Sequence, residues 1–188
     1  MTTHTIRYYI NADPCNEAFT DTLFCQDRND DGFDGGSFTN CTFVNCMFTG
    51  RLYEYVFTNC TFTGCDFLQV VWDACQWKHC VWDDATRGVP TMAEERKRLV
   101  AVVTQVDATP HLLDMTMWDT KTECGTAYCI GGWLIHLFAD VSVPYLDRKH
   151  ASRSHNHAFA LAPNASAYFY RSNDDARAWL AQFRASAY

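Results

Sequence analysis

The side chains best suited to chemistry in this sequence are the cysteines and histidines of its C-terminal half. Cys124 and Cys129 lie five residues apart. Four histidines follow them along the chain: His136, His150, His155 and His157. Zinc prefers thiolate and imidazole, but paired ligands of common structural sites stand two to four residues apart. We therefore expect no metal, and favour buried thiols on a helix that packs closely through Gly131 and Gly132. A Cys/His metal-binding protein is kept as an alternative.

Thiol catalysis finds little support in the same segment. A nucleophilic cysteine needs an adjacent base and an electropositive pocket, and nothing in the sequence fixes His136 beside either thiol. The sequence also lacks a P-loop, a dinucleotide-binding fingerprint, an HExxH motif and a G-x-S-x-G motif. We expect no catalytic residues, no cofactor and no enzymatic activity.

A second candidate for chemistry is the acidic segment that precedes Phe33. Asp27, Asn29, Asp31 and Gly32 match positions 1, 3, 5 and 6 of an EF-hand calcium loop. Position 12, which needs a bidentate glutamate, is instead Phe38. We therefore expect a solvated acidic turn rather than a calcium site.

Most of the ten cysteines fall on a five-residue period. A large apolar residue recurs along that period at Phe38, Phe43, Phe48, Leu52, Phe57, Phe62, Phe67, Trp72, Trp77 and Trp82. Cysteines occupy many of the positions two residues earlier, namely Cys41, Cys46, Cys60, Cys65, Cys75 and Cys80. Because free cysteine behaves as a small hydrophobe, we expect both sets to form a structural core.

This repeat resembles the pentapeptide-repeat family, whose chains wind into a right-handed quadrilateral parallel β-helix. In that family the central Phe or Leu and the small residue two before it point inward, five residues make one side, and about twenty make a coil. The resemblance implies a β-helix within residues 1–88, with clear repeats over 33–85, preceded by an acidic N-terminal segment.

The stacked rows implied by such a coil pair like with like. Phe48 and Leu52 are only four residues apart, so one side is a residue short. With that deletion the rows become Phe38/Phe57/Trp77, Phe43/Phe62/Trp82, Phe33/Leu52/Trp72 and Phe48/Phe67. Phe19 and Phe24 have the same spacing, which indicates an earlier start with 27–32 as an inserted loop.

The C-terminal half, residues 89–188, is predicted to be a small all-α domain. The five-residue period stops after Ala85, and Gly88-Val89-Pro90 marks a boundary. Thr91 to Glu94 form a capping box before an apolar stripe at helical spacing, and 173–175 cap a last helix. The pattern D-M-x-x-W, then C-G-T-x-x-C-I-x-G-W, resembles a small helical domain of phage and bacterial proteins of unsettled function, over roughly residues 95–185.

Charge is concentrated in the first half of the chain. Residues 1–85 hold twelve Asp and Glu against four Lys and Arg, whereas 86–188 hold ten against eleven. An acidic half repels nucleic acid and attracts basic protein surfaces. We therefore expect no direct nucleic-acid binding but a partner with a basic groove, contacted through Asp27, Asp30, Asp31, Asp34, Asp66, Asp73, Asp83 and Asp84.

The sequence predicts no membrane association. Its longest nearly uncharged apolar run, 128–139, is twelve residues long and falls short of a bilayer span. Residues 1–14 carry no apolar core of a secretory signal. We expect a cytoplasmic protein, in the host cytoplasm if it is phage-encoded, with its cysteines reduced.

The family resemblance and the acidic half together favour a non-enzymatic, DNA-mimic-like inhibitor of a nucleic-acid-handling protein or complex. Phage-type counter-defence, such as anti-CRISPR or anti-restriction activity, and topoisomerase modulation are the forms considered. Residues 33–85 make only about 2.6 coils, roughly 13 Å, so we expect a compact acidic plug rather than a long duplex mimic. The alternative is a structural or assembly protein that binds other proteins through its helical domain. We expect that domain to cover the end of the β-helix after Trp82, where many family members dimerise, and a homodimer is left open.

Overall fold

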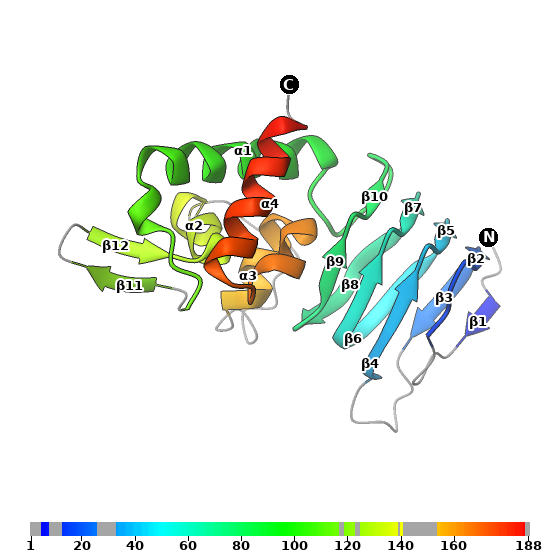
Figure 1. Cartoon of the computed structure of the whole chain (residues 1–188). Coiled ribbons are helices and arrows are strands. Elements are labelled where there is room, and N and C mark those ends of the chain that lie inside the picture. The colour runs from blue at the N-terminus through cyan, green and yellow to red at the C-terminus, as the bar shows by residue number, and fades with distance from the viewer. Residues whose placement is uncertain are drawn as a thin grey trace.

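A stack of short parallel strands forms the N-terminal half of the molecule, and helices lie at one end of that stack (Figure 1). The computed structural model describes residues 5–7, 13–25, 33–116, 119–122, 125–138, 140 and 154–186. The strands are β1 (Thr5–Arg7), β2 (Ala18–Thr20), β3 (Thr22–Cys25), β4 (Phe33–Thr39), β5 (Thr42–Val44), β6 (Met47–Thr58), β7 (Thr61–Thr63), β8 (Asp66–Asp73), β9 (Gln76–Lys78) and β10 (Val81–Trp82).

These strands form two parallel sheets. In the six-stranded sheet, β3, β4, β8 and β9 all pair with the long strand β6, and β1 pairs with β3. The four-stranded sheet has the order β10-β7-β5-β2. The fold is therefore a mixture of parallel β-sheet and helices.

The strand register agrees with the rows predicted from the sequence. Phe57 pairs with Phe38 on one side and Trp77 on the other, and Phe62 pairs likewise with Phe43 and Trp82. A third row joins Phe33, Leu52 and Trp72, while the rings of Phe48 and Phe67 stack at 4.7 Å. The short step after Phe48 is absorbed by a register shift between Met47 and Thr49.

The stack extends one level earlier than the clear repeats. Phe19 pairs with Phe43, Phe24 pairs with Phe48, and both residues are buried in the same cluster. The expected early start of the repeat is therefore confirmed. The inserted loop over 27–32, where we expected a solvated acidic turn rather than a calcium site, lies outside the described residues.

Left-handed backbone turns the chain between successive strands. Two residues after many of the central apolar residues φ is positive, at Asp21, Gly35, Asn40, Asn45, Gly50, Glu54, Asn59, Gly64, Ala74 and His79. Glycine and asparagine adopt this conformation more readily than other residues. At Gly64 an added Cβ would also lie 2.8 Å from the Asn45 amide oxygen, so that side chain would have to shift.

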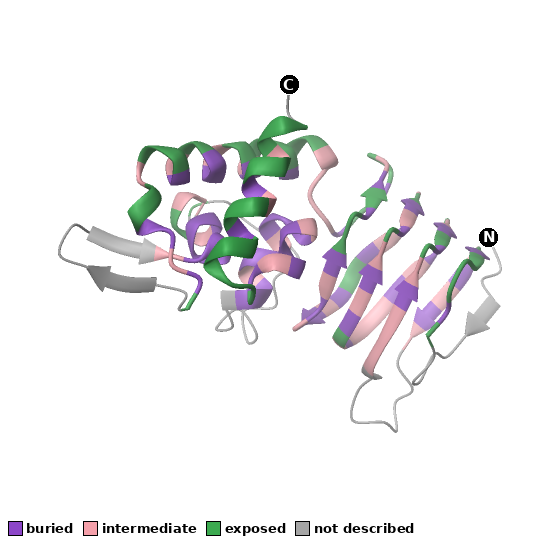
Figure 2. Ribbon diagram, in the orientation of Figure 1, coloured by how far each residue is buried: buried purple, intermediate pink, exposed green. Residues whose placement is uncertain are grey.

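All sixteen residues predicted for the structural core are buried. Buried positions recur along the strands of the stack (Figure 2). Aromatic rings fill the space between the two sheets. Phe43 stacks on Phe62 at 4.9 Å, a distance typical of adjacent strands, and Phe62 stacks at 4.8 Å on Trp77 of the other sheet. Each strand level buries its apolar face only against the levels on either side of it.

The C-terminal half combines helices with a β-hairpin. Its elements are α1 (Met92–Ala108), η1 (Pro110–Leu112), β11 (Asp119–Thr122), β12 (Gly125–Tyr128), α2 (Ile130–Leu137), α3 (Ser154–Leu161), η2 (Pro163–Tyr168) and α4 (Asn173–Ala185). The strands β11 and β12 pair antiparallel, so this half is not all-helical as expected. The β-branched threonines of 119–126 suit strands better than helices.

Capping residues fix where the first and last helices begin. The Thr91 side chain accepts a hydrogen bond from the Glu94 backbone and the Glu94 carboxylate accepts one from Thr91, which confirms the capping box. The last helix is capped by Ser172 rather than by residues 173–175. Asn173 instead accepts a hydrogen bond from the Met115 backbone at 2.7 Å.

The buried apolar residues of the described chain form two clusters, one within the strands and one among the helices. Phe159 of α3 is fully buried and belongs to the strand cluster, where it contacts Trp72 at 5.0 Å and Trp77 at 5.8 Å between ring centres. The helices are thus joined to the last strands by packing. Within the described parts of the chain, no helix has the length and apolar character needed to cross a membrane.

Replacement of Phe62 by aspartate tests this core. Phe62 is fully buried, and an unpaired buried carboxylate costs several kcal/mol, a large share of the roughly 5–15 kcal/mol that stabilises a domain. We expect Phe62→Asp to abolish soluble expression. Thr42→Asp, at an exposed position of neighbouring β5, is the matched control and should remain soluble with a melting temperature near the wild-type value. A soluble Phe62→Asp protein with native melting behaviour would contradict the stacked core.

Candidate functional site

Three of the predicted acidic residues lie together on one edge of the strand stack. Asp21 backbone N–H donates to Val44 at 3.0 Å, Asn45 donates to Thr63 at 2.8 Å, and Gly64 donates to the Asp83 carboxylate at 2.9 Å. These contacts align successive turns. Asp66 follows two residues after one of these turns and Asp84 directly after Asp83, so we define Asp21, Asp66, Asp83 and Asp84 as the acidic edge.

The carboxylates of the acidic edge differ in how far they are engaged. Asp66 forms an ion pair with Arg87, and Asp84 is exposed. Asp83 accepts hydrogen bonds from the backbones of Gly64 and Thr86 and from the Thr86 hydroxyl, which hold the pKa of its carboxyl below the ordinary value. The edge therefore carries negative charge that is partly neutralised by one arginine.

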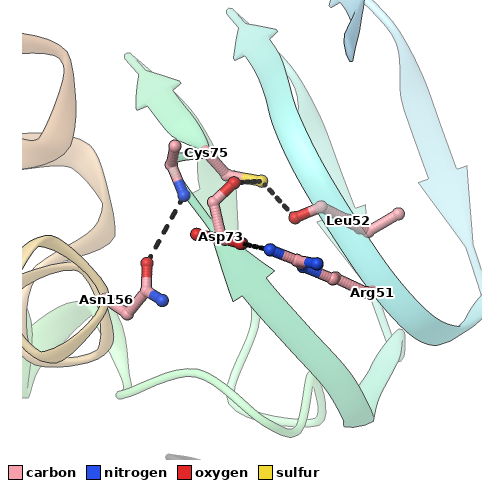
Figure 3. A network of polar contacts seen from close by, with 6 residues as sticks. Arg51, Leu52, Asp73, Cys75 and Asn156 are labelled. Carbon is pink, nitrogen blue, oxygen red and sulfur yellow. Dashed lines mark hydrogen bonds and ion pairs between the residues drawn. The ribbon is translucent and has the colours of Figure 1, made fainter. Parts of the chain in front are cut away.

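Asp73 departs from the expectation of an acidic binding surface. Its side chain is fully buried and forms an ion pair with Arg51 of β6 (Figure 3). Next to it, the Ala74 backbone donates to the Asn156 side chain of α3 at 3.4 Å. Asp73 lies where the strands meet the helices, and a partner protein cannot reach it.

The structure describes no side-chain position for the remaining predicted acidic residues, so their role as binding residues stays a prediction. Asp27, Asp30 and Asp31 lie outside the described residues. Asp34 is in β4, but its side chain is also outside the described set. Asp21 was not among the predicted site residues, although its place two residues after Phe19 is a signal of a turn within the five-residue period.

Polar side chains of α3 and η2 cover the last strands. The Asn164 side chain bridges Cys80 twice, accepting from its N–H at 2.8 Å and donating to its carbonyl at 2.9 Å. Ser166 Oγ accepts from the Trp77 N–H at 2.8 Å, and His155 Nε2 lies 2.9 Å from the Cys75 carbonyl. These contacts replace the hydrogen bonds that a further strand would make.

Burial fixes the ionisation of two of these groups. Desolvation lowers the pKa of His155 below the ordinary histidine value, which favours the neutral imidazole and a hydrogen bond from Nε2 to Cys75. Burial also raises the pKa of the Cys75 thiol to about 12, so this cysteine stays protonated at neutral pH. Neither group is prepared for nucleophilic chemistry.

The stacked cysteines satisfy backbone carbonyls of the preceding level. Sγ of Cys60 lies 3.3 Å from the Phe38 carbonyl, and Sγ of Cys80 lies 3.4 Å from that of Phe57. Every cysteine that the structure describes is free of disulfides. These thiols act as small core residues with a weak donor, as the repeat predicts.

The predicted metal and thiol candidates of the C-terminal half are only partly described. Cys124 and His150 lie outside the described residues. Cys129 is buried at the start of α2, where its sulfur accepts from the Gly132 N–H at 3.2 Å and burial raises its pKa. Among the residues that can be described, no three Cys, His, Asp or Glu side chains gather as metal ligands would.

A cavity of about 410 Å³ opens between α1, η2 and α4. Its lining is largely apolar and aromatic, and includes Tyr168, Trp179 and Phe183. Glu95 of α1 also lines it and is 3% exposed. One Glu95 oxygen accepts from the Asn164 N–H at 2.7 Å and the other from the Asn164 side-chain amide at 3.2 Å.

Comparison with known proteins adds no relative: no family model matches the chain, and no curated protein sequence matches it.

Several residues that organise these sites were missed from the sequence. Each of these residues forms hydrogen bonds with a partner that lies 69 to 89 positions away in the sequence: Glu95, Asn156, Asn164 and Ser166. No local sequence pattern can predict contacts over such separations. One signal was present, because Asn164 and Ser166 interrupt an otherwise apolar run over 158–167. Isolated polar residues in a buried segment need hydrogen-bond partners.

Replacement of Asn164 by alanine tests the cover over the last strands. The change would leave the Cys80 N–H and carbonyl without their partners, which should cost roughly 3 kcal/mol and lower Tm by about 6–12 °C. Gln182→Ala, at an exposed position of α4, is the control and should barely change Tm. Thermal unfolding measured by circular dichroism distinguishes them, and equal melting of both variants would show that the Asn164 bridge contributes no stability.

Proposed function

We propose that the protein is a non-enzymatic interaction protein of the pentapeptide-repeat type, which binds a basic groove of a nucleic-acid-handling protein or complex through its acidic edge. On this proposal the two parallel sheets are the sides of a right-handed quadrilateral β-helix, and the helical half closes one end of it. The acidic edge is the observation that carries the proposal.

The repeat geometry supports the β-helix part of the proposal. Aligned central residues are separated by 20 positions, which equals four sides of five residues, or by 19 positions where one side is a residue short. Positive φ recurs two residues after the central position, where each corner of a quadrilateral coil would lie. The inward cysteines and aromatic residues are buried on both sheets.

The arrangement of charge supports the binding part. Asp21 lies at the first of four aligned turns and Asp83 and Asp84 at the last, with the uncharged Asn45 and Gly64 between them, so carboxylates lie at both ends of one edge. Levels lie about 4.8 Å apart, which gives an edge of roughly 15 Å over three steps. A short row of carboxylates can occupy a basic groove that otherwise holds phosphates, but it is too short to replace a long duplex.

Charge reversal on the acidic edge distinguishes two hypotheses: electrostatic binding of a basic partner through this edge, and assembly with other proteins through the helical half. The experiment is affinity capture from bacterial lysate at low and high salt, with excess duplex DNA as competitor. We expect the wild type to retain a nucleic-acid-handling complex that salt and DNA both displace, and Asp84→Lys to lose at least about tenfold of the captured complex.

The matched control is Glu54→Lys, an exposed acidic residue at a different turn of β6. It makes the same change of charge, and on the quadrilateral arrangement it lies two corners away from the acidic edge. We expect it to capture the complex as the wild type does. If nothing is retained, or if capture ignores salt, DNA and Asp84→Lys, the inhibitor proposal fails, and salt-insensitive capture would support assembly through the helices.

A further inference from the structure

The cavity between α1, η2 and α4 has the size and lining of a small-molecule site. Its volume of about 410 Å³ lies within the range of typical ligand pockets, roughly 300–1,000 Å³. Tyr168 stacks on Trp179 with 4.4 Å between ring centres, and Trp179 lies 6.0 Å from Phe183. Three aromatic rings therefore follow one wall.

Glu95 brings a carboxylate into this apolar lining. It is buried in the first turn of α1, and its two hydrogen bonds both come from Asn164. An ionised carboxylate has about four acceptor sites, so roughly two remain for a ligand in the cavity that Glu95 lines. A buried carboxylate with acceptor sites left open is costly unless a cation or further donors approach it.

The nearby basic side chains are held by other groups. Arg96 also lines the cavity, but its guanidinium lies over the Phe183 ring at 5.9 Å and donates to the Ser186 carbonyl at 3.2 Å. Arg98 donates to the Leu161 carbonyl at 2.8 Å and contributes a favourable charge at longer range. No ion pair to Glu95 occurs within the described residues.

We propose that this cavity binds a small organic cation, an ammonium group with apolar substituents, whose charge faces Glu95 and whose apolar part packs against Trp179 and Tyr168. A cation gains both from the carboxylate and from the faces of the aromatic rings. An anion of the same size would instead meet a buried negative charge, and a neutral apolar ligand would leave the acceptor sites of Glu95 unused. The cavity is built by α1, η2 and α4, and so this inference does not depend on the acidic edge.

The ionisation of Glu95 gives this site a characteristic pH dependence. Burial raises the pKa of Glu95 to about 7, although the hydrogen bonds from Asn164 and the charge of Arg98 act to lower this pKa. A bound cation favours the ionised form, so binding below pH 7 must release a proton. Affinity should therefore fall by roughly tenfold for each pH unit below about 7 and level off above it.

Isothermal titration calorimetry of the full chain with benzyltrimethylammonium tests the proposal, because this cation does not titrate. We expect saturable 1:1 binding between pH 5.5 and 8 with the pH profile above. The anion 3-phenylpropionate, of similar size, should bind at least about tenfold more weakly at pH 8. Absence of saturable binding of the cation, or preference for the anion, would overturn the proposal.

Two variants test whether Glu95 binds the ligand directly or only positions Asn164. Glu95→Gln should weaken binding at pH 8 by about tenfold or more and remove the pH dependence. His79 lines the same cavity, so His79→Asn is the matched control and should retain the pH profile. The reverse result, a profile lost in His79→Asn and kept in Glu95→Gln, would contradict the assignment.

Trp179→Leu provides a second test if Glu95→Gln does not fold. Trp179 is only partly buried on α4, so its loss should leave a folded protein. We expect it to weaken binding of the cation several-fold by removing one aromatic face, whereas unchanged affinity would place the ligand outside this cavity.

Discussion

The unpaired edge of the last strands is the constraint on which the rest of the structure depends. A stack of parallel strands buries its apolar faces level by level, but its final level leaves N–H and carbonyl groups with no next strand. Burying them unpaired would cost a large part of the stability of the protein. The described structure meets this constraint with side chains of α3 and η2, and Asn164 serves both polar groups of Cys80.

Two acidic residues are buried at or near this junction. Glu95 accepts two of the three hydrogen bonds that Asn164 donates, and so holds that amide toward the strand edge. Asp73 pairs with Arg51 at the point where α3 approaches β8. Both carboxylates therefore have structural roles, and Asp73 is not part of the protein surface. The exposed negative charge lies on residues at the turns.

The sequence predicted the strand stack well because its determinants are local and periodic. A large residue every five positions, with a small residue two before it, fixes which side chains point inward, and Phe62 and Cys60 are buried as that spacing requires. The hairpin of β11 and β12 was missed, since the helical resemblance outweighed the strand propensity of its threonines. Asp73 was misjudged because its contacts are not local: it pairs with Arg51, 22 residues earlier, and the neighbouring Ala74 is bonded to Asn156 of α3. The candidate site was predictable only in part for the same reason: positions on the repeat could be assigned, but contacts between the two halves could not.

The most direct measurement is amide hydrogen exchange at Trp77 and Cys80, followed by NMR in native protein. Both N–H groups point away from the stack and donate to Ser166 and Asn164, respectively. If the helical half completes the last level, these amides should exchange as slowly as those of Val81 and Thr61, which donate to the carbonyls of the preceding level. Exchange at the rate of an exposed strand edge would contradict a covered end, and with it the view that one continuous unit joins the strand stack to the helices.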